Sequence, residues 1–197
     1  MTCSKLKSSS NNFLHTDSGV AAIEAAFILP FMLMLYFGLF DLTAAIGFSR
    51  KITATANAVA DMTAQNRTSI LKSDVTDYFN AGSMIMSPTP MSNVTVNVYG
   101  YRMTGSTPTQ IWKTSNGSGP GCNATPNTTA MSPLMAAGND LVVTIACYSY
   151  TPYVATFLGS KILGSTAIKI EQTIMVRPRS TSKLDCYTTV AQTASCT

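Results

Sequence analysis

The chain has 197 residues, enough for one ordinary domain together with a membrane segment. Charged residues make up only 11% of it and hydrophobic residues 46%, which suits an anchored protein with a small extracytoplasmic domain better than a cytosolic enzyme. The formal charge of +4 is spread thinly and contains no run of Lys or Arg, so no nucleic-acid partner is expected.

The first segments indicate a leader and a membrane helix. Residues 1–18 are polar and rich in Ser and Asn, which predicts a flexible cytoplasmic leader. An apolar run then extends from Val20 to Phe40, about the 20 residues that a helix needs to cross a bilayer. Apolar residues continue at helical spacing to Gln65, so residues 20–66 are predicted to form the transmembrane helix and its continuation.

Glu24 is the only charged residue in this apolar run. An unpaired carboxylate is costly in hydrocarbon, and an ionisable residue at such a depth is therefore a functional hypothesis by default. Asp41, at the end of the run, is expected instead to reach interfacial water, with a partner contact as the alternative.

The order of residues around Glu24 resembles the processing site of type IV pilin-like precursors. The run Gly19-Val-Ala-Ala-Ile-Glu24-Ala-Ala-Phe-Ile-Leu-Pro30 is most similar to TadE-like proteins of tight-adherence (Flp, type IVb) pilus systems. The resemblance implies that prepilin peptidase cleaves between Gly19 and Val20 and removes residues 1–19. It also implies that Glu24 neutralises the free amino terminus of a neighbouring subunit.

Residues 67–197 are predicted to form an extracytoplasmic α+β domain. An amphipathic helix is expected over residues 69–80, with a stop at Ala81-Gly82. Alternating apolar and polar residues predict four strands, at Asn93–Arg102, Gln110–Thr114, Leu141–Tyr150 and Ala167–Arg177.

The segments between and after these strands are predicted to be less regular. Residues 115–140 are expected to form a long loop, Pro152 to start a short helical stretch to Leu158, and the tail after Pro178 to be irregular. The fold class is therefore α+β, a long N-terminal transmembrane helix followed by a small antiparallel-sheet ectodomain. The TadE-like resemblance implies the same pilin-like plan.

The cysteines indicate the compartment. Cys3 precedes the apolar run, and four cysteines follow it. An even set of four on one side suggests an oxidising compartment and two disulfides, with three possible connectivities. We predict Cys122–Cys147 and Cys186–Cys196, because each pair closes a short local loop. This places the ectodomain outside the cytoplasm, and the TadE-like resemblance implies a single-pass protein of the bacterial inner membrane, with a cytoplasmic N-terminus and a periplasmic ectodomain.

Catalytic and metal-binding patterns are weak. The only histidine, His15, lies in the leader, so histidine-dependent chemistry is not expected in the ectodomain. Asp74 and Asp77 are best interpreted as a solvated helix face, and Glu171 as one partner of a cross-strand ion pair. The sequence contains no P-loop or dinucleotide fingerprint. We therefore expect no enzyme activity, no cofactor and no metal.

Together these features indicate a TadE-like minor pilin (pseudopilin), or an assembly component, of a tight-adherence pilus. The expected partners are prepilin peptidase, the major and minor pilins, and the inner-membrane assembly platform; the protein would reside in the membrane or in the surface pilus. An unprocessed, permanently anchored assembly factor is a variant of this hypothesis. The alternative from another class is a membrane-anchored extracellular binding module outside any pilus, with Trp112 and the tyrosines as its contact surface.

Overall fold

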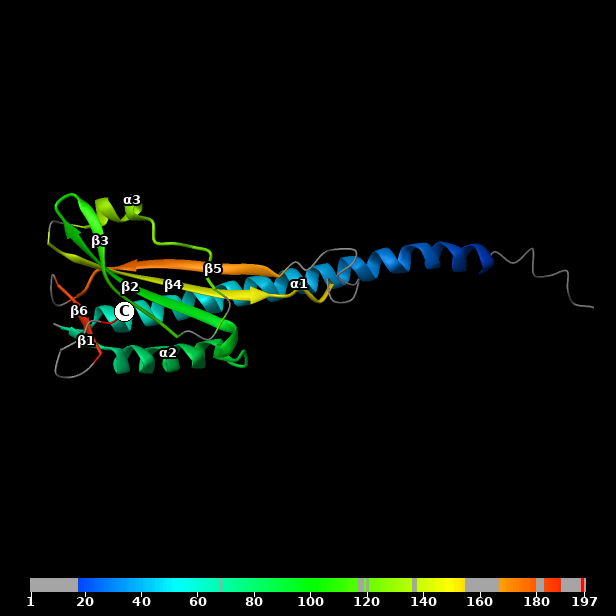
Figure 1. The fold of residues 1–197 in the computed structure, drawn as a ribbon. Coiled ribbons are helices and arrows are strands. Elements are labelled where there is room, and N and C mark those ends of the chain that lie inside the picture. Colours follow the sequence, from blue (N-terminus) through cyan, green and yellow to red (C-terminus); the bar gives the residue numbers. More distant parts are fainter. Residues whose placement is uncertain are drawn as a thin grey trace, which may run out of the picture.

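The computed structural model describes residues 18–67, 69–116, 119, 121–135, 138–154, 167–179, 183–188 and 196. One long helix, α1 (Ser18–Ala64), begins the described chain. Its first half projects alone, and its second half is packed into a head formed by all the other elements (Figure 1). The expected α+β class, with a long apolar N-terminal helix before a small antiparallel-sheet domain, is confirmed.

In chain order, the head elements after α1 are β1 (Ser69–Leu71), α2 (Lys72–Met86), η2 (Met91–Asn93), β2 (Val94–Thr104), β3 (Thr107–Ser115), α3 (Thr128–Met131), η3 (Ser132–Leu134), β4 (Asp140–Tyr150), β5 (Ile168–Val176) and β6 (Asp185–Tyr187).

The main sheet has four antiparallel strands in the order β3-β2-β4-β5. All four predicted strands are present, and their ends differ from the prediction by a few residues. A tight turn joins β2 to β3, where Gly105 has a φ of 64°, a backbone conformation that favours glycine. Strands β2 and β4 lie in the middle of the sheet, and most of their side chains are buried on both faces.

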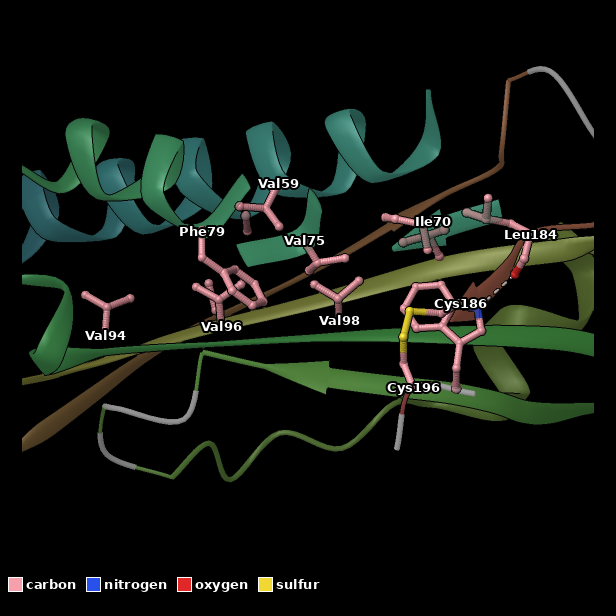
Figure 2. Packing of buried hydrophobic residues seen from close by; sticks show 14 of the residues in the cluster. Val59, Ile70, Val75, Phe79, Val94, Val96, Val98, Leu184, Cys186 and Cys196 are labelled. Carbon is pink, nitrogen blue, oxygen red and sulfur yellow. Dashed lines mark hydrogen bonds between the residues drawn. A yellow bond between two sulfur atoms is a disulfide. The ribbon is translucent and has the colours of Figure 1, made fainter. Parts of the chain in front are cut away.

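The larger core lies between the sheet and the two long helices. Val94, Val96 and Val98 alternate along β2 and face α1 and α2, as Figure 2 shows. They meet Val59 of α1 and Phe79 of α2, among other residues. The head is therefore built on the second half of α1, which together with α2 forms the helical side of this core.

Helix α2 differs from its predicted bounds at both ends. Residues Ser69–Leu71 form the short strand β1, and the helix then continues through the predicted stop as far as Met86. Gly82 is buried against α1, and a Cβ there would lie only 3.1 Å from Cγ2 of Thr55. The glycine therefore allows close helix packing instead of ending the helix.

A second core covers the opposite face of the sheet. Tyr99, Tyr101 and Met103 of β2 pack there with residues of β4, beneath Met131 and Met135. The segment predicted as a plain loop thus contains α3 and η3, which cover this face. The apolar residues of this segment pack on side chains of the sheet. Its own sequence therefore could not show that these residues would be buried.

The prediction of an irregular C-terminal tail is wrong at residues 185–187, which form β6, and much of the rest of the tail lies outside the described residues. Strand β6 pairs in parallel with β1, and Ile70 is the register partner of Cys186, which is remote from it in the sequence. Leu184 and Cys186 are almost fully buried beside Ile70, at one end of the larger core (Figure 2). Such a pairing depends on two short strands that are remote in sequence, and neither has a local pattern long enough to predict it.

Within the described residues, α1 is the one helix long and apolar enough to cross a membrane. None of its most apolar window is buried in the head. The large side chains of this half are exposed, among them Phe27, Phe31 and Leu39. This helix is compatible with a single-pass membrane anchor.

Candidate functional site

The predicted processing residues lie at the exposed start of α1. Gly19 and Val20 are in its first turn and Glu24 is about one turn further on, where the helix makes no contact with the head. No atom of the described residues outside the adjoining helix backbone lies within 4 Å of the position that a Cβ of Gly19 would occupy. Among the described residues, none forms an ion pair with Glu24. Cleavage after Gly19 and pairing of Glu24 with another subunit stay predictions.

Asp41, which directly follows the apolar run, is bound to the head. The hydroxyl of Tyr150 donates to its Oδ1 at 2.9 Å. The backbone N–H of Tyr153 donates to the same oxygen at 2.8 Å, and that of Val154 to Oδ2 at 2.7 Å. Only 8% of Asp41 is exposed. The expectation that Asp41 reaches interfacial water is therefore wrong, since three protein donors take the place of water.

The donors to Asp41 come from the end of β4 and the turn after it. Tyr153 and Val154 begin a helical turn, as predicted from Pro152; the rest of the predicted stretch, 155–158, lies outside the described residues. The first N–H groups of a helical turn have no partner within it, so a carboxylate is a good acceptor for them. Pro152 predicted the start of this helical turn, but no pattern near it in the sequence indicated that the turn would bind Asp41.

Burial, followed by the hydrogen bond to Asp41, raises the pKa of Tyr150 to about 12. Its hydroxyl therefore stays protonated at physiological pH and remains a donor to Asp41. Two aromatic contacts with Phe48 extend this junction along α1: its ring stacks on Tyr148 at 4.8 Å and packs against Tyr150 at 5.5 Å between centroids. Hydrogen bonds and ring packing thus attach α1 to β4 over about two turns.

The four cysteines after the apolar run lie in the two predicted pairs. Cys122 and Cys147 are bridged with their Cα atoms 5.6 Å apart, and Cys186 and Cys196 with theirs 5.3 Å apart. The first bridge fastens the segment after β3 to strand β4, and the second holds the C-terminal segment against the core. Both bridges hold irregular chain against regular elements of the head.

Two of the three head acids considered in the sequence analysis accept backbone hydrogen bonds. Glu171 accepts the backbone N–H groups of Asn123 and Ala124 at 2.6 and 2.8 Å, so the prediction of a cross-strand ion pair is wrong. Asp74 accepts the N–H of Leu71 at the start of α2, whereas Asp77 is exposed. In the described part of the chain, no group of three or more His, Cys, Asp or Glu could hold a metal ion.

One charge cluster around the buried Asp140 was missed by sequence reasoning. Arg102 forms two hydrogen bonds with Asp140, at 2.7 and 2.8 Å, and one with Asp185, at 2.9 Å. The hydrogen bonds to Asp140 are the main reason that the pKa of Arg102 is raised. Arg102 and Asp140 are direct partners in the β2–β4 register. A prediction of that register from the sequence would therefore have placed the two charges opposite each other. The cluster joins the main sheet to β6.

Trp112 is part of the core and not of an outer surface. It is 2% exposed, and its indole Nε1 donates to the carbonyl of Leu184 at 2.8 Å. Tyr99 and Tyr101 are also buried. The contact surface expected for the binding-module alternative is therefore not formed by these residues.

Residues 19–61 match the family model described as TadE-like protein. The match confirms the resemblance over these residues alone, less than half of the chain, and it covers α1 from Gly19 through Glu24 and Asp41 to Asp61. It points to a role in tight-adherence pilus systems and their assembly machinery. No curated protein and no solved structure matches the chain.

Proposed function

We propose that this protein is a minor pilin (pseudopilin), or an assembly component, of a bacterial tight-adherence pilus, without catalytic activity of its own. It is a substrate of prepilin peptidase and crosses the inner membrane once, with the head in the periplasm. The observation that carries this proposal is the TadE-like match over residues 19–61, on a helix whose first half is exposed and apolar.

The exposed half of α1 is suited to serve as both anchor and assembly surface. Side chains such as Phe27 and Leu39 need an apolar environment, which lipid or neighbouring helices can supply. No atoms lie within 4 Å of the Cβ positions of Gly38 and Gly47, so another helix could approach closely there. The proposed partners are the major and minor pilins and the inner-membrane platform.

Processing is tested at Gly19. Replacing Gly19 by Ser, or by a larger residue, is expected to block cleavage, because the peptidase must fit closely around the backbone before the scissile bond. Gly47→Ser, on the same helix and in similarly open space, is the matched control and should be processed normally. The measurement is the mass and N-terminal sequence of protein that is co-expressed with its own peptidase. An intact Met1 terminus in the wild-type protein would refute processing.

Assembly is tested at Glu24. Glu24→Gln should leave membrane insertion and cleavage intact but weaken pull-down of the major pilin and lower the number of surface pili. A neighbouring ammonium would lose its countercharge in a low-dielectric bundle, and an unpaired buried charge costs about 3–5 kcal/mol. Asp77→Asn, an exposed substitution in the head, is the control. Normal binding and piliation by Glu24→Gln would mean that the acid is only tolerated, which would favour an anchored protein outside the pilus.

A further inference from the structure

Two exposed aromatic rings meet where the apolar half of α1 joins the head. Phe40 is the last residue of the apolar run, and Tyr153 follows the end of β4. Their ring centroids are 5.7 Å apart, yet the two residues remain 53% and 60% exposed. A ring contact between separate elements therefore forms a surface that the described part of the chain leaves uncovered.

A third exposed apolar residue, Ile168, lies at the same end of the sheet. It begins β5 and is 51% exposed. In the β4–β5 register it is the partner of Tyr150, which binds Asp41. The end of β4 and the start of β5 reach farthest along α1 toward its apolar half (Figure 1). Phe40, Tyr153 and Ile168 are called the junction patch below.

The junction patch lies at a defined distance along α1. At about 1.5 Å per helical residue, the run from Val20 to Phe40 is roughly 30 Å long, the thickness of the hydrocarbon core of a bilayer. If α1 crosses the membrane as proposed above, Phe40 and Tyr153 lie at the boundary between acyl chains and headgroups. Tyrosine is enriched at that depth because its ring is apolar and its hydroxyl is polar.

We propose that the junction patch is a membrane-contact surface, covered by the headgroup–acyl boundary of the bilayer that α1 crosses. Asp41 is its positioning residue. By binding Tyr150, Tyr153 and Val154, its carboxylate holds the end of β4 against α1 and sets the depth of Tyr153. The head thus contacts the membrane and keeps a fixed orientation relative to α1.

Two features favour lipid as the occupant of this patch. Phe40 belongs to the apolar run, so the patch continues directly from the surface that the hydrocarbon core would cover. In addition, both carboxylate oxygens of Asp41 accept hydrogen bonds from the protein, so this charge can lie at the boundary without access to water. A carboxylate that was still hydrated would instead hold the junction away from lipid.

The test uses the full chain in vesicles of phosphatidylcholine and phosphatidylglycerol. Flotation with the vesicles at alkaline pH, which releases peripherally bound protein, establishes that α1 is inserted, independently of where the head lies. Tyr153→Trp then introduces a reporter at the patch, while the single native Trp112 is buried and serves as a background present in every sample. Met84→Trp, at a residue of α2 that is 79% exposed, is the matched control.

The proposal predicts opposite behaviour of the two reporters. The added emission of Tyr153→Trp should be blue-shifted, strongly quenched by lipids spin-labelled near the headgroup, and protected from aqueous iodide. The added emission of Met84→Trp should be quenched by iodide and not by the labelled lipids. Combining Asp41→Asn with Tyr153→Trp should lower quenching by lipid and raise quenching by iodide, while the buried Trp112 emission shows that the head remains folded.

Three results would overturn the inference. Quenching of Tyr153→Trp by iodide in vesicles that carry the inserted protein would show that the patch faces water, and it would leave the anchor intact. Protection from both quenchers would show that protein covers the patch, for instance a second copy of the chain. Failure to float would remove the membrane anchor on which the inference rests, and the proposed function with it.

Discussion

Replacing Arg102 by methionine is expected to lower the free energy of unfolding by about 3–5 kcal/mol, the usual effect of leaving a buried charge without its partner. The side chain of Asp140 is only 2% exposed, and Arg102 is its cationic partner. Asp140 would keep only uncharged partners, such as the N–H of Leu184. Methionine retains much of the length of arginine, so the loss should reflect charge more than volume.

The matched control for Arg102→Met is Arg179→Met. Arg179 also pairs with an aspartate, Asp61, but their side chains are 62% and 40% exposed. An exposed ion pair contributes only about 0–1 kcal/mol. Urea unfolding of both variants, followed by the emission of Trp112 in detergent-solubilised full chain, measures the difference. Equal losses in the two variants would contradict the role assigned to the pairing of Arg102 with the buried Asp140.

Trp112→Ala is expected to cost about 3–5 kcal/mol of unfolding free energy, the range for removing a large buried aromatic side chain. The substitution opens a cavity in the larger core and removes the hydrogen bond to the carbonyl of Leu184. Because Leu184 precedes β6, the C-terminal segment should loosen first. The measurement is urea unfolding followed by far-ultraviolet circular dichroism, since the variant lacks its only tryptophan.

Gly100 tests the same packing from the opposite side. A Cβ at Gly100 would lie 2.2 Å from Nε1 of Trp112, so Gly100→Ala must displace the indole, and overpacking of this kind costs about 1–3 kcal/mol. Gly121→Ala, where a Cβ meets no atom within 4 Å, should leave the unfolding free energy almost unchanged. If both alanine variants had the unfolding free energy of the wild type, that result would contradict the close contact between β2 and Trp112.

The sequence by itself determined the features that depend on local pattern. The apolar run with Glu24 predicted the exposed helix, because length and composition suffice to recognise such a segment. Alternation along residues 94–98 predicted β2, because the side chains of a strand point to opposite faces in turn. The cysteine pairs followed from sequence proximity, since each bridge closes a short loop of 25 or 10 residues.

Only the tertiary structure decided the features that join distant segments. Asp41 meets Tyr150 and the turn after it, more than a hundred positions later in the chain. Strand β6 meets β1 across a similarly long interval, and Trp112 meets Leu184, which is 72 positions away. In each case, the acid, the short strand or the aromatic ring has an ordinary local pattern, and its environment comes from elements that folding brings beside it. The attachment of the head to α1 therefore depends on packing and hydrogen bonds between segments that are distant in the sequence, and no single segment specifies these contacts.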